Sequence, residues 1–119
     1  MKRLLLVDDD TDILESLAVI LADSFEVVSA CNGVEALHAL ERQRFHAVVL
    51  DLTMPVMDGE TLIEKMRAAG IVVPVVLASG ISELRQLAER LGVEHISKPY
   101  NFGELLAKLL LLVARDSRR

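Results

Sequence analysis

The sequence is poor in cysteine and in aromatic residues, and each shortage narrows the class of protein. Cys31 is the only cysteine among 119 residues, so no disulfide can form within the chain, and a reducing compartment is expected. Aromatic residues make up 3% of a chain that is 52% hydrophobic, so the core must be aliphatic, as it is in parallel α/β sheets. We therefore expect one cytoplasmic domain over residues 1–119, without metal or disulfide staples in its core.

Long hydrophobic segments and basic charge are also scarce. The longest apolar stretch near the carboxyl end, residues 109–114, is too short to span a bilayer. Near the amino end, Lys2 and Arg3 lead only into a short apolar run, which does not fit a signal peptide. Acidic residues outnumber basic ones by 18 to 13, giving a net charge of -5. This balance argues against direct binding to nucleic acid or to a membrane surface.

The apolar residues that are present alternate between two periodicities. Short runs rich in β-branched residues predict strands over 3–7, 26–30, 47–50, 73–78 and 95–97. Stripes at helical spacing predict helices after Asp10 or Thr11 and over about 34–40, 58–69, 81–91 and 102–115, with Val34 and Phe102 facing inward. Because the connections are short, right-handed crossovers onto one parallel sheet are the expected arrangement.

Charged and polar residues follow the predicted strands. Asp8 and Asp9 follow the first strand, Asp51 the third, Ser79 the fourth and Lys98 the fifth, and in a parallel sheet these ends meet at one edge. At an effective dielectric near 20, carboxylates about 4 Å apart repel by roughly 4 kcal/mol per pair, so the cluster needs a cation. Hard oxygen ligands favour Mg²⁺. The set is typical of a phosphoryl-transfer site whose nucleophile is a carboxylate.

Taken in order, residues 4–10 (LLLVDDD), 51–59 (DLTMPVMDG) and 97–100 (SKPY) resemble the receiver domain of two-component response regulators over nearly the whole chain. The resemblance implies a flavodoxin-like (βα)5 three-layer sandwich with a parallel five-stranded sheet in the order 2-1-3-4-5. It also implies a signalling module, with no output domain in this chain. Such a module accepts a phosphoryl group as an aspartyl phosphate and assists its own phosphorylation and dephosphorylation, but is not classed as an enzyme.

Residue roles follow from the resemblance by position. Asp51 matches the phosphoacceptor that takes its phosphoryl group from a histidine kinase or a phosphotransfer protein. Asp9 and Asp51 would contact Mg²⁺ together with the main-chain carbonyl of Thr53, and Asp8 would act through water.

The remaining matched positions concern the response to phosphorylation. Ser79 matches the switch hydroxyl, Lys98 the lysine that pairs with the phosphoryl group, and Pro99 a cis-proline that orients this lysine. The output surface would be the face made by the fourth helix, the fifth strand and the last helix. His95 stands where the family often has Tyr or Phe. It is either a partly exposed strand residue or a rotating group with a pH dependence of its own.

The last predicted helix is apolar on more than one side. The apolar stripe that should face the core is complete without Leu110 and Leu111, which fall on faces expected to be exposed to solvent. Single exposed leucines are ordinary, but these two are adjacent to further apolar residues. They define a candidate face for homodimerisation or for a docking partner.

Two other functions compete with the phosphoacceptor. A metal-dependent phosphatase would also use Asp51 as nucleophile, but such enzymes commonly need a second acid two residues later, where this chain has Thr53. A receiver-like binding module that works without phosphorylation would normally lack Asp51, the acidic pair or Lys98, all of which are present.

Overall fold

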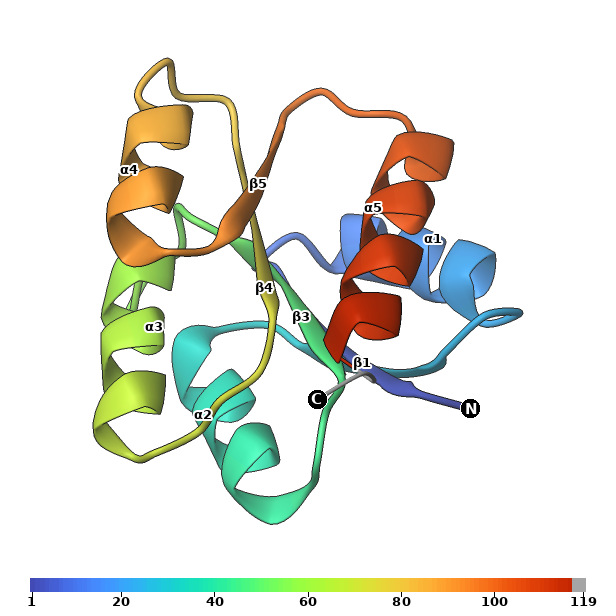
Figure 1. Ribbon diagram of the computed structural model, residues 1–119, viewed down its shortest axis with the longest axis horizontal. Coiled ribbons are helices and arrows are strands. Elements are labelled where there is room, and N and C mark those ends of the chain that lie inside the picture. The colour runs from blue at the N-terminus through green and yellow to red at the C-terminus, as the bar shows by residue number, and fades with distance from the viewer. Residues whose placement is uncertain (117–119) are drawn as a thin grey trace.

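The computed structural model describes residues 1–116, in which strands and helices alternate (Figure 1). The strands are β1 (Arg3–Val7), β2 (Glu26–Ala30), β3 (Ala47–Asp51), β4 (Val75–Ser79) and β5 (Glu94–Ser97). The helices are α1 (Thr11–Leu21), α2 (Gly33–Arg42), α3 (Gly59–Ala68), α4 (Leu84–Leu91) and α5 (Phe102–Asp116). All strand pairs are parallel, and the described strands form one sheet in the order β2-β1-β3-β4-β5, which confirms the predicted topology.

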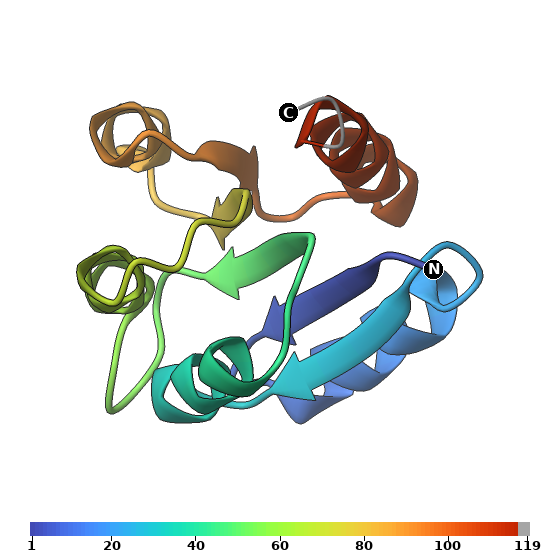
Figure 2. The same cartoon turned by 60° about the horizontal axis from the view of Figure 1, so that its bottom comes forward.

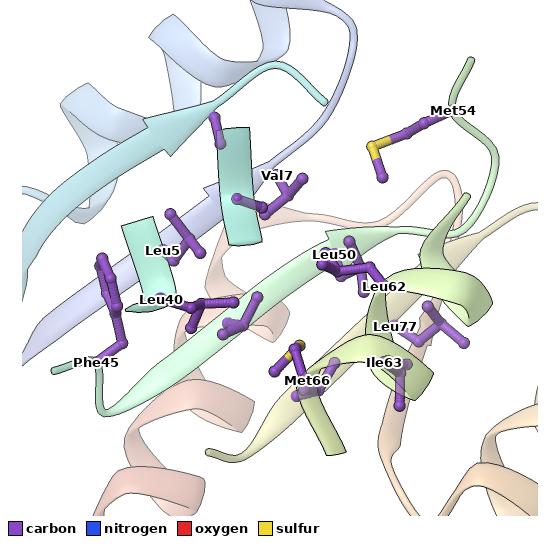
Figure 3. Close-up of a cluster of buried hydrophobic side chains, with 14 of the residues drawn as sticks. Leu5, Val7, Leu40, Phe45, Leu50, Met54, Leu62, Ile63, Met66 and Leu77 are labelled. Atoms are coloured by element: carbon purple, nitrogen blue, oxygen red, sulfur yellow. The ribbon is translucent and has the colours of Figure 1, made fainter. Parts of the chain in front are cut away.

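Two apolar clusters lie on the two faces of this sheet. Helices α2, α3 and α4 cover one face, and α1 and α5 cover the other (Figure 2). Because successive strand side chains point to opposite faces, Leu5 and Val7 join the first cluster while Leu4 and Leu6 join the second. Figure 3 shows the first cluster, in which Leu62 of α3 packs with the strand side chains. The aliphatic core expected from the composition is present on both faces.

Side-chain caps mark the start of several helices. Asp10 is the N-cap of α1, because its carboxylate accepts hydrogen bonds from the backbone N–H groups of Asp12 and Ile13. Asn32 caps α2, and Asp58 caps α3. One member of the acidic run at residues 8–10 therefore has a local structural role, which leaves the other two for the site described below.

Several element boundaries differ from the predicted ones, most clearly the starts of α4 and β4. Helix α4 begins at Leu84 rather than at residue 81, and Glu83 at its N-cap makes no side-chain capping bond. Strand β4 begins at Val75 rather than at residue 73. Pro74 has no N–H to donate to the sheet, although its carbonyl accepts a hydrogen bond from Val48.

The inward positions predicted for Val34 and Phe102 are wrong. Both side chains are exposed, while Gly33, Ala36 and Leu40 are the buried residues of α2. Val34 lies in the first turn of α2 and Phe102 begins α5, each after a loop that leaves the carboxyl edge of the sheet. Apolar side chains in a first helical turn near this edge have less of the sheet to pack against and are therefore more exposed. Within residues 1–116, no helix has both the length and the apolar character needed to cross a membrane.

Candidate functional site

Three acidic side chains meet at the carboxyl edge of the sheet. Val7 pairs with Leu50 in the β1–β3 register, so Asp8, just after β1, lies beside Asp51, the last residue of β3. Asp8 and Asp51 are buried, with 6% and 8% exposure, whereas Asp9 is exposed. Carboxylate oxygens of the three residues lie within 4.8 Å of one another. This is a set of hard oxygen ligands with one open side, and it can hold a divalent cation such as Mg²⁺.

Lys98 reaches this cluster from the loop between β5 and α5. Its backbone N–H donates to the carbonyl of Ser79 at 2.8 Å, which fixes the start of the β5–α5 loop against the end of β4. Its Nζ atom lies 3.3 Å from Oδ1 of Asp51 and 3.5 Å from Oδ2 of Asp8. The Lys98–Pro99 peptide bond is cis, as the resemblance implied. The lysine thus supplies one positive charge to the two buried carboxylates.

Backbone donors hold these carboxylates in place. The backbone N–H of Asp10 donates to Oδ1 of Asp8 at 2.9 Å, so both Asp8 oxygens have partners within the chain. The backbone N–H of Thr53 is close enough to the Asp51 carboxylate to lower its pKa. The main chain at Thr53 therefore lies near the Asp51 carboxylate.

Burial and charge perturb the titration of the site. Burial raises the pKa of Asp51, the nearby Lys98 ammonium lowers it, and the net direction is upward. Burial lowers the pKa of Lys98, but the carboxylates of Asp51 and Asp8 outweigh it, and the net direction is again upward. Burial also raises the pKa of Tyr100, whose phenol is close enough to Lys98, Asp8 and Asp51 for their charges to affect it. Sequence reasoning included Tyr100 in the motif but gave it no role at the site.

Two glycines allow the loop after β3 to pack closely. A Cβ atom at Gly59 would lie 2.9 Å from the backbone oxygen of Asp51 and 3.0 Å from Cα of Leu52, so α3 can begin there only without a side chain. A Cβ atom at Gly33 would lie 2.8 Å from Sδ of Met57. Sequence reasoning gave Gly59 a part in shaping the turn, but it missed both close contacts, because neither partner is adjacent in sequence.

Ser79 and His95 lie on the same face of the sheet. Ser79, the last residue of β4, is buried, and its Oγ accepts a hydrogen bond from the backbone N–H of Ile81 at 3.2 Å. The β4–β5 register pairs Leu77 with His95 and Ser79 with Ser97. Leu77 belongs to the cluster under α2, α3 and α4, so the alternation of strand side chains directs His95 toward that same face, where it is half-buried.

Leu110 and Leu111 are both exposed, but on different sides of α5. Leu110 lies one turn after Leu106, which packs against the α1–α5 cluster. Leu111 lies three residues after Lys108, whose Nζ atom reaches Glu94 of β5 at 3.5 Å. Since residues three or four apart share a helix side, Leu110 extends the side of α5 next to the α1–α5 cluster, and Leu111 extends the side next to β5.

A doubly wound parallel sheet with a metal-competent carboxylate cluster and a lysine at its carboxyl edge defines a class of protein suited to accepting phosphoryl groups. Comparison with known families agrees: residues 4–110 match the model of the response regulator receiver domain. The chain belongs to this family of phosphoryl-accepting signalling modules of two-component systems. Members of the family are signalling modules rather than enzymes.

Individual relatives support this assignment. The transcriptional regulatory protein PrrA of Mycobacterium tuberculosis is 38% identical over 117 residues, covering 95% of this chain and 50% of PrrA. A CheY-like receiver domain protein from Methanospirillum hungatei superimposes with a TM-score of 0.91 at 30% identity, covering 99% of this chain and 98% of that one. TrrA of Thermotoga maritima, solved in complex with Mg²⁺ and BeF, gives 0.84 at 32% identity, covering 94% and 99%. The chain spans about half the length of the curated relatives it matches.

Proposed function

We propose that Asp51 accepts a phosphoryl group from a histidine kinase or a phosphotransfer protein, and that the resulting aspartyl phosphate changes the surface that this chain offers to a downstream partner. The observation that carries the proposal is the position of Asp51. It ends a central strand, is buried beside Asp8, and has Lys98 3.3 Å from its Oδ1 atom. We place this chemistry in the cytoplasm, in agreement with the single unpaired cysteine.

The carboxylates of this chain fit a magnesium ion. Asp9 and Asp51 would hold it together with the main-chain carbonyl of Thr53, and Asp8 would contribute through water. The fit rests on the 4.8 Å spread of the carboxylate oxygens and on the mutual repulsion of three acids with only one lysine beside them. When bound, Mg²⁺ neutralises charge on the phosphoryl oxygens as they approach these acids.

The chain's own residues perform the transfer. A carboxylate oxygen of Asp51 attacks the phosphorus atom, the phosphorus–nitrogen bond to the donor's histidine breaks, and the electron pair of that bond remains on the imidazole nitrogen. The ammonium of Lys98 is already beside Asp51 and pairs with the phosphoryl oxygens after transfer. In this sense the chain assists its own phosphorylation, and the same groups would assist hydrolysis of the aspartyl phosphate by water.

The signal is a change of charge at the sheet edge. Phosphorylation adds about one to two negative charges and new acceptor oxygens. Ser79 can donate its hydroxyl proton to one of these, which would reorganise the turn whose Ile81 N–H now binds Ser79 Oγ. His95 is on the same face, so it is the side chain placed to follow Ser79. If His95 is a rotating group, His95→Phe will remove a pH dependence from partner binding; an unchanged pH profile would assign His95 a purely structural role.

Helix α5 supplies a second candidate surface. Leu110 and Leu111 are exposed apolar side chains, which favours homodimerisation or docking of a partner on α5. Because the two residues lie on different sides of the helix, Leu110→Glu and Leu111→Lys should be tested separately. Analytical ultracentrifugation would identify which side, if either, mediates self-association.

Intact-mass analysis after incubation with acetyl phosphate and Mg²⁺ tests the phosphoacceptor directly. We expect one phosphoryl increment, abolished by Asp51→Asn or by chelation of the metal. Asp58→Asn is the matched control, because Asp58 lies in the same loop and Asn also caps helices, so labelling should persist. If the Asp51→Asn protein were still labelled, another residue would be the phosphoacceptor. Failure both to label and to bind beryllium fluoride with Mg²⁺ would indicate a module that works without phosphorylation.

A further inference from the structure

Val56 combines two unfavourable features at the tip of the loop that carries the phosphoacceptor. Its backbone φ angle is 72°, and it is the only non-glycine residue with positive φ in the described part of the chain. The N–H of Met57 donates to the carbonyl of Pro55 at 2.8 Å, which closes a three-residue γ-turn around Val56. A β-branched residue in this conformation is strained, because its side chain crowds its own backbone.

The chain is anchored just before this turn, at Met54, and at its last residue, Met57, whereas the centre of the turn is not anchored. Met54 is buried in the cluster drawn in Figure 3, and Met57 fits against Gly33 at the start of α2. Val56 between them is 87% exposed. The chain therefore bears both backbone strain and exposed apolar surface at one position, and packing within residues 1–116 compensates for neither. Local strain of this kind clusters at functional sites.

The surroundings of Val56 show what could cover it. Ile81 after β4, Phe102 at the start of α5 and Val34 in the first turn of α2 are also exposed, and all four residues follow strands at the carboxyl edge of the sheet. They lie at the same edge of the sheet as the acidic site. A phosphorylated donor protein must approach this same edge if its phosphoryl group is to reach the buried carboxylate of Asp51.

Electrostatics alone would not hold such a donor. Its phosphoryl group is anionic, and Lys98 and a bound Mg²⁺ would at most balance the three carboxylates of the edge, on a chain of net charge -5. Attraction must come from other contacts, and exposed apolar side chains around a polar centre are a common source.

We propose that Val56 is a docking contact for the protein that donates the phosphoryl group, and that the strained turn serves to present it. This inference rests on the proposed function and adds a residue that selects between donors. A small phosphodonor such as acetyl phosphate reaches Asp51 without touching Val56, whereas a phosphohistidine on a folded protein does not.

The test compares the two kinds of donor on matched variants. Val56→Asn keeps a residue that tolerates positive φ but removes the apolar side chain. Val56→Ile keeps an apolar, β-branched side chain. Val72→Asn is the control, because Val72 is 86% exposed but precedes β4 at the opposite edge of the sheet. The protein donor is a purified histidine kinase core, autophosphorylated with ATP and chosen because it phosphorylates the unaltered chain.

We expect Val56→Asn to lower kcat/KM for transfer from the phosphorylated kinase by about tenfold, the effect of losing one buried apolar contact. Val56→Ile and Val72→Asn should stay within about twofold of the unaltered chain, and Mg²⁺-dependent labelling by acetyl phosphate should be unchanged in all three. Equal transfer rates from the kinase to Val56→Asn and the unaltered chain would overturn the proposal. So would a parallel fall with acetyl phosphate, because the turn would then act by positioning Asp51. If neither donor labels the unaltered chain, it is the proposed function that fails.

Discussion

Replacing Lys98 by methionine removes the one cation that the structure places against Asp8 and Asp51 while keeping a side chain of similar length. At an effective dielectric near 20, each of the contacts at 3.3 and 3.5 Å contributes about 5 kcal/mol of attraction, and each carboxylate pair, with oxygens within 4.8 Å, contributes about 3.5 kcal/mol or more of repulsion. Without Lys98 the repulsion is uncompensated, and the pKa of Asp51 rises further because Lys98 no longer lowers it.

The net loss is smaller than these contact energies. Removing one partner of a buried ion pair typically costs about 3–5 kcal/mol, and the Lys98 side chain is 29% exposed, so water screens part of its interaction. We expect Lys98→Met to lower the free energy of unfolding by about 2–3 kcal/mol in the absence of divalent cations. With excess Mg²⁺ the loss should shrink by about 1 kcal/mol or more, because the ion both stabilises the folded state by binding and no longer meets repulsion from the lysine.

Urea denaturation followed by circular dichroism, with and without Mg²⁺, measures both quantities. The matched control is Lys108→Met. Lys108 is 30% exposed and lies 3.5 Å from Glu94, a half-exposed carboxylate on β5. Its loss should cost less than about 1 kcal/mol, with no dependence on Mg²⁺. If Lys98→Met were no more destabilising than Lys108→Met, or equally destabilising with and without Mg²⁺, the electrostatic account of the site would be wrong.

Three further outcomes follow from the structure. Gly59→Ala should lower the free energy of unfolding by about 1–3 kcal/mol and slow labelling by acetyl phosphate, because its Cβ would meet backbone atoms 2.9 and 3.0 Å away. Gly103→Ala, whose Cβ would have only an ordinary contact at 3.5 Å, should be neutral or stabilising. Equal stabilities of the two variants would contradict the close-packing argument. The thiol of Cys31 donates a hydrogen bond to the Glu35 carboxylate, which raises the pKa of the thiol. Glu35→Gln should therefore speed alkylation of Cys31 by iodoacetamide at pH 8 several-fold. An unchanged rate would show that Glu35 does not raise this pKa. Tyr100 is the only tyrosine of a chain without tryptophan, so an ultraviolet titration reports on its phenol alone, and its raised pKa predicts ionisation above about pH 10 in the folded state. Stability should fall as pH rises through that window, because the folded state retains a proton that the unfolded state has released. Ionisation of the folded protein at or below pH 10 would refute this.

The sequence by itself determined the architecture and the chemistry. Five short apolar runs alternating with amphipathic stripes leave few alternatives to a doubly wound parallel sheet, because short connections require right-handed crossovers. Once the sheet is parallel, all strand ends fall on one edge, and the acids and Lys98 are brought together by topology alone. The clustering of Asp8, Asp9 and Asp51 is confirmed for this reason, whereas the strand order, which is also confirmed, was implied by the resemblance to receiver domains.

The tertiary structure decided what depends on contacts between segments distant in sequence. Helical periodicity placed Val34 and Phe102 inward, but periodicity does not reveal where the sheet ends, and both first-turn residues are exposed at its edge. The need for glycine at position 59 arises from the backbone at the end of β3, and Val56 has its positive φ angle in a loop held by the buried Met54 and by Met57, which lies against Gly33. Leu110 and Leu111 are exposed as their pattern predicted, but only packing against the sheet shows that they belong to different sides of α5. Local pattern specifies which residues can do the chemistry, whereas close packing specifies which surfaces remain for a partner.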